Sequence, residues 1–159
     1  MNLFSVNLVL ALVWTALTDS FTVSGFLTGY AIGLGALWLT QPLYGETGNY
    51  FMRSVRIVEL AVYFVYDLVV SSLRVTWDVI TPQDLSCPKI IEVPLQAESD
   101  LEILLVTNLI SLTPGTLSLD VSPDRKTLFV HAMFAEHPEE VIEGLQDGME
   151  YHVRRVFTA

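Results

Sequence analysis

Long apolar runs dominate the first third of the sequence. Residues 1–52 contain only two acidic or basic side chains, Asp19 and Glu46. The run Leu3–Leu17 is apolar but shorter than the about 20 residues that a bilayer-crossing helix needs, whereas Ser20–Tyr44 carries no charge and is long enough. Since Asp19 lies in the short link between them, the pattern predicts a helical hairpin in a membrane.

Polar side chains recur every three or four positions in the next segment, residues 53–80. They fall on one face of a helix and comprise Arg56, Glu59, Tyr63, Asp67, Ser71, Arg74 and Asp78. An amphipathic helix of this length measures roughly 40 Å. It either crosses the membrane with its polar face against a partner or lies along the membrane surface, and the sequence does not choose between these orientations.

Shorter periodic stretches follow and predict a small α+β domain. The expected strands are Ile90–Val93, Thr116–Val121 and Thr127–His131. One helix is expected between the capping box of Ser99 and Glu102 and the break at Pro114. A second helix begins near Pro138, and its expected buried stripe consists of Val141, Leu145, Met149, Val153 and Val156.

These patterns together predict two regions. Residues 1–80 form a membrane α-helical region, with a short helical hairpin followed by a long amphipathic helix. Residues 88–159 form a soluble α+β domain of order β-α-β-β-α, with its helices on one face of a short sheet.

Charge is as unevenly distributed as hydropathy. From Asp84 onward there are 13 acidic and 5 basic residues, which accounts for most of the net charge of −10, so the chain lacks the basic surface that a nucleic-acid partner requires. Basic residues at Arg53, Arg56, Arg74 and Lys89 all follow the hairpin. The positive-inside bias then predicts a multi-pass protein of the cell membrane with a cytoplasmic C-terminal domain, and it disfavours a third helix that crosses.

Motifs for catalysis or for cofactor binding are not apparent. The sequence has no Gly-rich phosphate loop, nucleophile elbow or zinc-ligand spacing. His131, His137 and His152 are expected on a strand, a loop and a helix, and the single Cys87 cannot form an internal disulfide. We therefore expect no catalytic residues, no metal site and no cofactor.

Two features of the expected helices suggest contacts with other helices or with ions. Gly25, Gly29 and Gly33 are spaced by four and predict a flat strip on which another membrane helix can pack. The ionisable members of the amphipathic face form what we call the polar stripe, which consists of Arg56, Glu59, Asp67 and Arg74. Such a stripe can belong to an ion or proton path, although a helix in the membrane plane with a solvated polar face has the same pattern.

The segment Thr113-Pro114-Gly115 separates the apolar helix of the domain from the following strand. Proline ends the helix, and glycine can adopt a positive φ. We interpret this segment as a structural turn.

The whole chain resembles the E subunits of Mrp-type multisubunit cation/proton antiporters. The resemblance rests on Trp14 and on four longer stretches of sequence. These are Gly25–Gly33 (GFLTGYAIG), Pro88–Leu95 (PKIIEVPL), Thr107–Val121 (TNLISLTPGTLSLDV) and Thr127–Ala132 (TLFVHA). The resemblance implies an accessory component of a complex of several membrane subunits that exchanges sodium or a related cation for protons. It also implies that larger partners carry out most of the antiport.

Other functions remain open from the residues alone. A self-contained small transporter would need more membrane spans than are visible here. A membrane-anchored interaction domain of another complex fits the same pattern, whereas an enzyme anchored by the hairpin would need converging polar groups in the C-terminal domain.

Overall fold

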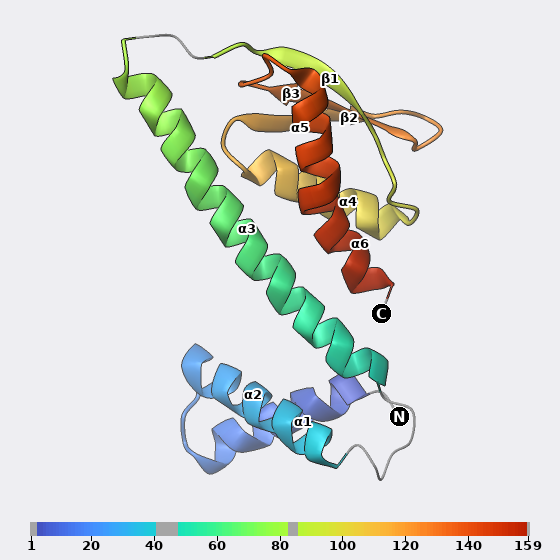
Figure 1. Cartoon of the computed structure of the whole chain (residues 1–159). Coiled ribbons are helices and arrows are strands. Elements are labelled where there is room, and N and C mark those ends of the chain that lie inside the picture. Colours follow the sequence, from blue (N-terminus) through green and yellow to red (C-terminus); the bar gives the residue numbers. More distant parts are fainter. Residues whose placement is uncertain (1–2, 41–47, 83–85, 159) are drawn as a thin grey trace. The chain divides into compact units, whose positions relative to one another are not determined.

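The structure, a computed structural model, describes residues 3–40, 48–82 and 86–158 (Figure 1). Its elements follow in the order α1 (Leu3–Leu17), α2 (Val23–Leu39), α3 (Gly48–Ile80), β1 (Lys89–Pro94), α4 (Asp100–Leu112), β2 (Thr116–Val121), β3 (Thr127–Ala132), α5 (Pro138–Leu145), a π-helical turn η2 (Gln146–Glu150) and α6 (Tyr151–Phe157). The chain divides into two compact units, one that ends at Val55 and one that spans Arg56–Thr158.

Helices α1 and α2 form the predicted hairpin. The hydroxyl of Thr22 caps α2 by accepting a hydrogen bond from the backbone N–H of Gly25 at 3.1 Å. Asp19, in the link, adopts a positive φ of 48°, which short polar side chains tolerate better than most. Helix α2 is shorter than the apolar segment in the sequence, and residues 41–44 of that segment lie outside the described ranges.

Large apolar side chains cover the outer surface of the hairpin. They include Phe4, Val9, Leu12, Leu17, Phe21, Val23, Leu27 and Leu39. Among the helices in the described ranges, none combines the length and the apolar character needed to cross a membrane.

Helix α3 is the predicted long amphipathic helix, and it begins five residues earlier than the sequence pattern indicated. Within the C-terminal unit, Leu60, Tyr63 and Phe64 of α3 are half-buried and pack against the core of the domain. The domain core therefore includes one face of α3 in addition to the elements that follow it.

The strands form an antiparallel sheet in the order β1-β3-β2. Alternate residues of the central strand β3 are buried, and Val130 of β3 pairs with Ile91 of β1 and with Ser118 of β2. An irregularity in the register between Ser118 and Asp120 marks a β-bulge in β2. The predicted β-α-β-β-α order is confirmed, and pairing also reaches back to Cys87, which bridges to Phe134.

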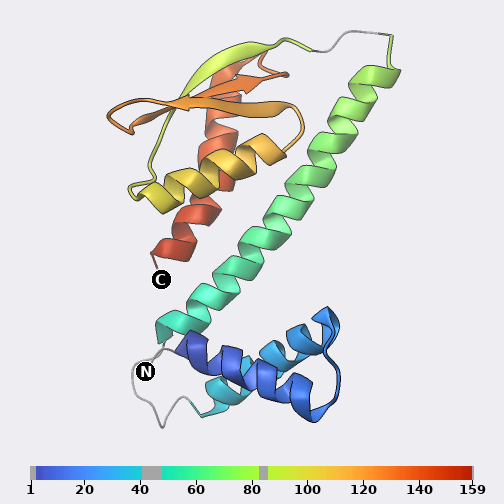
Figure 2. The same cartoon turned by 180° about the vertical axis from the view of Figure 1, so that it is seen from behind.

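Helix α4 and the α5–α6 segment cover the same face of this sheet (Figures 1 and 2). The core between them consists of Ile91, Val93, Val106, Ile110, Leu128, Val130, Ala132, Ala135, Met149 and Val153. The hydroxyl of Ser99 accepts a bond from the N–H of Glu102 at 3.3 Å, and the Glu102 carboxylate accepts one from the N–H of Glu98 at 3.1 Å. This arrangement is close to the predicted capping box, displaced by one residue on its return bond.

The helix expected after Pro138 is interrupted. The π-helical turn η2 separates α5 from α6 and buries Gly148, Met149 and Glu150 together. Three members of the predicted apolar stripe, Met149, Val153 and Val156, are buried. A period of 3.6 residues cannot predict three consecutive buried positions, so the π turn was not visible in the sequence pattern.

Candidate functional site

The polar stripe of α3 faces the C-terminal domain of the same chain. At its N-terminal end, the guanidinium of Arg56 donates a hydrogen bond to the backbone carbonyl of Arg155 at 2.7 Å. The carboxylate of Glu59, one turn further on, forms an ion pair with the Arg155 side chain at 3.1 Å. Both stripe residues therefore bind the same residue of α6.

An aromatic contact follows along the same face. The ring of Tyr63 stacks on the ring of His152, with centroids 4.2 Å apart and an angle of 14° between the planes. The Nδ1 atom of His152 lies 2.8 Å from the carbonyl oxygen of Gly148, so this nitrogen carries the proton in the hydrogen bond. A Cβ atom at Gly148 would lie only 2.2 Å from the Tyr63 hydroxyl, and glycine is therefore what permits this close approach.

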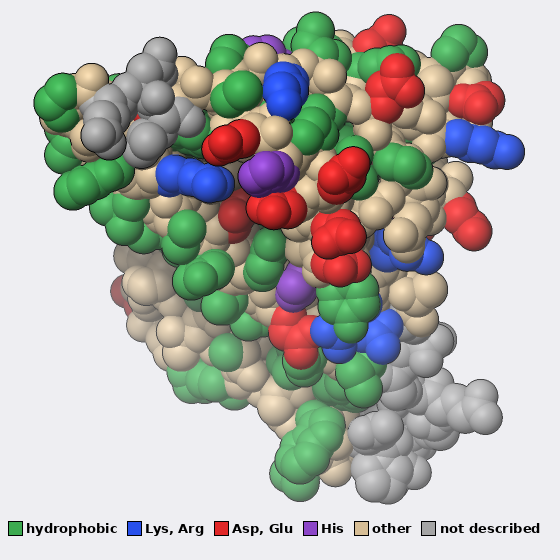
Figure 3. Space-filling model, turned by 45° about the horizontal axis from the view of Figure 1, so that its top comes forward, with side chains coloured by type: hydrophobic (Ala, Val, Ile, Leu, Met, Phe, Trp, Pro, Cys, Tyr) green, Lys and Arg blue, Asp and Glu red, His purple; other side chains and the backbone are tan. Residues whose placement is uncertain are grey.

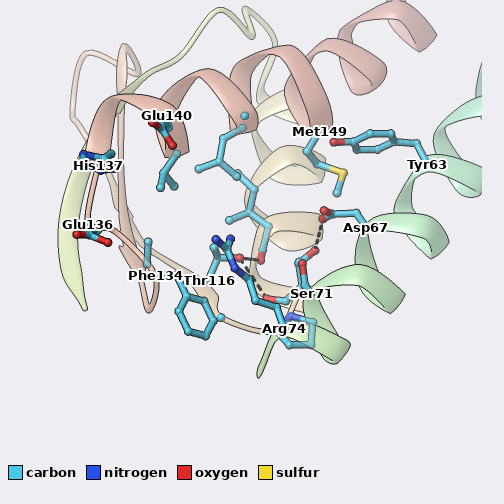
Figure 4. A pocket seen from close by; sticks show the side chains of 18 of the residues that line it. Tyr63, Asp67, Ser71, Arg74, Thr116, Phe134, Glu136, His137, Glu140 and Met149 are labelled. Carbon is cyan, nitrogen blue, oxygen red and sulfur yellow. Dashed lines mark hydrogen bonds between the residues drawn. The ribbon is translucent and has the colours of Figure 1, made fainter. Parts of the chain in front are cut away.

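The remaining stripe residues meet the turn region of the domain (Figure 4). The Thr113 hydroxyl donates to the Asp67 carboxylate at 3.2 Å and also lies 3.1 Å from the carbonyl of Leu109. The guanidinium of Arg74 sits 5.1 Å from the centroid of the Phe134 ring, which is the geometry of a cation–π contact. All members of the stripe thus have contacts within the C-terminal unit.

The predicted turn at Thr113 to Gly115 occupies the end of α4. Gly115 has a φ of +93°, a conformation that other residues adopt only with strain. Thr113 is buried, and its contact with Asp67 ties this turn to α3. The segment therefore serves as a turn after α4 and also attaches α3 to the domain.

A cavity of about 750 Å³ lies beside these contacts, between α3 and the domain within the C-terminal unit. Asp67, Ser71 and Arg74 line one wall, and Glu136, His137 and Glu140 line another (Figure 4). Acidic side chains gather on the domain face seen in Figure 3. Across the described part of the chain, no group of three or more His, Cys, Asp or Glu residues is placed to hold a metal ion, and the three histidines are not brought together.

The glycine strip of α2 lies against α1 and the link between the two helices. A Cβ atom at Gly29 would lie 2.8 Å from Cβ of Trp14 and 3.0 Å from the carbonyl oxygen of Ala11. At Gly33 it would lie 2.2 Å from Oδ1 of Asn7, and at Gly25 it would lie 2.3 Å from the carbonyl oxygen of Ser20. The role of the strip in assembly stays a prediction.

Sequence reasoning missed a buried polar cluster in the hairpin unit. Asn7 is fully buried, and its Nδ2 donates to the hydroxyl of Tyr50 at 2.9 Å. The Tyr50 hydroxyl in turn lies 3.1 Å from that of Tyr30. The available signal was a lone asparagine inside an apolar run, because such a residue needs a partner at a helix contact.

Glu150 was also missed. Its side chain is 2% exposed, and Oε1 accepts hydrogen bonds from the backbone N–H groups of Gln96 at 2.6 Å and Ala97 at 2.8 Å. The carboxylate therefore holds the segment between β1 and α4 against the π turn. No sequence signal could have found it, because periodicity places Glu150 beside the buried stripe and not within it.

Comparison with known proteins gives consistent results over nearly the whole chain. The family described as Na+/H+ ion antiporter subunit matches residues 7–156. The E1 subunit of a Na+/H+ antiporter from Staphylococcus haemolyticus is 34% identical over 151 residues, which cover 94% of each chain. The E subunit of a Na+/H+ antiporter from Alkalihalophilus pseudofirmus is 33% identical, also over 94% of each chain.

A solved structure shares the fold. It is a chain of the membrane-bound sulfane sulfur reductase, an archaeal respiratory membrane complex, with a TM-score of 0.57 and 98% of each chain covered. At 22% sequence identity, this likeness concerns the fold alone.

Proposed function

We propose that this chain, which belongs to the family of Na+/H+ ion antiporter subunits, is an accessory subunit without an ion path of its own. As a component of a transporter, the chain is not an enzyme. Its contribution is to assembly: the hairpin and α3 offer apolar surfaces to the membrane and to other membrane subunits, and partner subunits carry the exchanged ions.

The observation that carries this proposal is the occupation of the polar stripe. Ionisable groups on a membrane helix either line an ion path or pair with other protein groups. Here Glu59 pairs with Arg155, Asp67 accepts from Thr113, and Arg74 lies over Phe134. These contacts give the stripe a structural role, which is to hold α3 on the domain.

We further propose that the hairpin is inserted in the cell membrane and that the C-terminal domain lies on the cytoplasmic side. The apolar outer surface of α1 and α2 supports insertion. The basic residues after the hairpin, among them Arg53 and Arg56, support the cytoplasmic side. The resemblance to E subunits of Mrp-type antiporters supports assembly with several other membrane subunits.

The proposed domain boundary lies at residue 88. Strand β1 begins at Lys89, and all of the buried core residues lie between Ile91 and Val153, whereas Leu60, Tyr63 and Phe64 of α3 are only half-buried against them. A fragment of residues 88–159 is expected to give circular dichroism of mixed α and β type. A fragment that stays disordered in the presence of the remaining chain would move the boundary toward α3.

Neutral isosteres of the stripe test the absence of an ion path. In vesicles that contain the complete complex, Glu59→Gln and Asp67→Asn should keep most of the sodium–proton exchange, because each retains a hydrogen-bonding oxygen toward its partner. The exposed Glu143 provides the matched control as Glu143→Gln. Complete loss of exchange in Glu59→Gln or Asp67→Asn, with the variant chain still co-purifying with the other subunits, would contradict the proposal.

A further inference from the structure

The domain covers a long stretch of one face of α3. Contacts to it begin at Arg56, which bonds to the backbone of Arg155, and continue to Arg74, which lies over Phe134. At a rise of 1.5 Å per residue, the stretch between Arg56 and Arg74 measures roughly 27 Å. This length is close to the about 30 Å thickness of the hydrocarbon core of a bilayer.

The domain that lies along this stretch is a water-facing structure. Its exposed charged residues include Glu92, Asp100, Asp120, Asp124, Arg125, Glu139, Glu143 and Asp147. Each charged side chain placed at the bilayer centre costs about 2.5–3.5 kcal/mol on insertion scales, and a sheet edge in lipid adds unpaired backbone groups. If α3 crossed the membrane over residues 56–74, it would draw this surface into the hydrocarbon core.

The opposite face of α3 is apolar, and no residue in the described ranges covers it. Its side chains, 52–66% exposed, are Val58, Val62, Val65, Val69, Leu73 and Ile80. At helical spacing these positions share one side, and no acidic or basic residue falls among them. Contiguous exposed apolar patches rimmed by polar residues are typical of membrane or protein contact sites. The exposed rings of Tyr66 and Trp77 lie at its flank.

We propose that α3 lies along the membrane surface, with its uncovered apolar face in the boundary between headgroups and acyl chains and the domain on its water side. This inference rests on the proposed membrane location of the hairpin. Of the two orientations that the sequence left open, this inference selects the in-plane one. A helix in the membrane plane turns its polar face to water, and the polar face of α3 is the one that the domain occupies.

Two observations favour lipid over a protein partner as the occupant of this face. First, the start of α3, up to Val55, belongs to the same compact unit as the hairpin, whose outer surface is apolar, so with the hairpin inserted as proposed α3 starts at the membrane. Second, tyrosine and tryptophan side chains at the flank of an apolar helix face are typical of the headgroup level of a bilayer. Tyr66 and Trp77 are 65% and 61% exposed and meet this description.

The depth of single spin labels along α3 tests the proposal. In a Cys87→Ser background, Val58→Cys, Val69→Cys and Leu73→Cys are labelled, and the complex is reconstituted in liposomes of phosphatidylcholine and phosphatidylglycerol. Collision with oxygen, which partitions into lipid, is compared with collision with a water-soluble nickel chelate. Glu143→Cys on the domain gives the aqueous reference.

The expected result is one shallow depth, just below the phosphates, at all of the labelled α3 positions. A depth that changes steadily along the helix, by about 1.5 Å per residue, would overturn the proposal in favour of a crossing helix. Immobile labels shielded from both oxygen and nickel would overturn it in favour of a protein partner on this face. Because the measurement reports depth and not exchange, its outcome is independent of whether the chain contains an ion path.

Discussion

The hairpin and the C-terminal unit differ in which side chains they bury. In the hairpin, the buried residues are spaced by four on both helices, with Leu3, Asn7, Ala11 and Thr15 on α1 and Gly29, Gly33 and Leu37 on α2. Most of these side chains are small or absent. The C-terminal unit instead buries branched aliphatic side chains from strands and helices, and leaves most of its charges at the surface.

This difference reflects two solvents. In water, burial of large apolar side chains drives the packing of the sheet against its helices. In lipid, apolar side chains gain little by meeting each other, so helices associate through close backbone contact and a few interhelical hydrogen bonds. In the hairpin unit, the glycine strip provides the close backbone contact, and the Asn7–Tyr50–Tyr30 cluster provides the hydrogen bonds. Helix α3 belongs to both regimes, since one of its faces joins the domain core and the other is apolar and uncovered.

The largest expected effect comes from breaking the close contact in the hairpin. Gly29→Leu should reduce co-purification with partner subunits severely, because its Cβ alone would stand 3.0 Å from the backbone oxygen of Ala11 and must push the helices apart. Membrane insertion should persist, since leucine favours the bilayer. Detergent extraction followed by quantification of each subunit measures both.

Gly35 provides the matched control for this comparison. No atom of the described residues lies within 4 Å of a Cβ atom at Gly35, so Gly35→Leu should assemble like the parent chain. A Gly29→Leu chain that assembles and transports normally while Gly35→Leu fails would show that the packing face has been assigned to the wrong side of α2.

Removal of the buried carboxylate should have the next largest effect, this time on the water-facing unit. Glu150→Ala leaves the N–H groups of Gln96 and Ala97 without their acceptor and should lower the free energy of unfolding by about 2–4 kcal/mol. Glu150→Gln keeps an acceptor oxygen and should cost about half as much. Chemical unfolding followed by circular dichroism measures the difference, with the exposed Glu143→Ala as reference. If Glu150→Ala and Glu143→Ala lower the free energy of unfolding equally, the Glu150 carboxylate does not stabilise the fold.

A smaller effect is expected where α3 meets the domain. Gly148→Ala places a methyl group 2.2 Å from the Tyr63 hydroxyl, and the stacked Tyr63 ring must move away from His152. Overpacking of this kind costs about 1–3 kcal/mol. The methyl group of Gly144→Ala meets no atom within 4 Å in the part of the chain that the structure describes, and this variant should leave the contact intact. Fluorescence energy transfer between labels on α3 and α6 reports their separation, and identical transfer in both variants would contradict this assignment.

The sequence predicted the elements well because their signals are local. Strand alternation, the Ser99 cap and the break at Pro114 each depend on neighbouring residues, and the structure has an element boundary or a strand at each position. Pairings between distant residues could not be predicted in this way. The polar stripe was recognised as a face of α3, yet its partner Arg155 lies 99 positions from Arg56, and no periodicity links the two.

The two missed features have different physical causes. The π turn adds one residue to a helical turn, which shifts the register and buries Glu150 where the regular period places a position beside the buried stripe. Asn7 was overlooked because its apolar neighbours outweigh it in any hydropathy average, although a single buried amide fixes the contact among α1, Tyr30 and Tyr50.

The smallest expected effect concerns the loop between strands β2 and β3, in the water-facing C-terminal unit. The Ser122 hydroxyl donates to the Asp124 carboxylate at 2.6 Å, and the N–H of Lys126 lies 3.3 Å from the same oxygen. These bonds hold the pKa of Asp124 below its ordinary value of 3.8, and the bond from the Ser122 hydroxyl is the largest cause. Ser122→Ala should therefore raise the pKa of Asp124 toward that value, which NMR titration of the carboxyl carbon measures.

The sign of the linked effect on stability follows from the lowered pKa. A carboxyl whose folded-state pKa is lowered stabilises the fold above its unfolded pKa, and this contribution is lost as the pH falls through the folded pKa. Ser122→Ala should accordingly show a slightly shallower loss of stability on acidification than the parent, and Asp124→Asn should lack this component altogether. Because Asp124 is fully exposed to solvent, the effect should be small and should shrink further in high salt. If the pKa of Asp124 is the same in Ser122→Ala as in the parent, the backbone N–H of Lys126 and not the hydroxyl holds the charge.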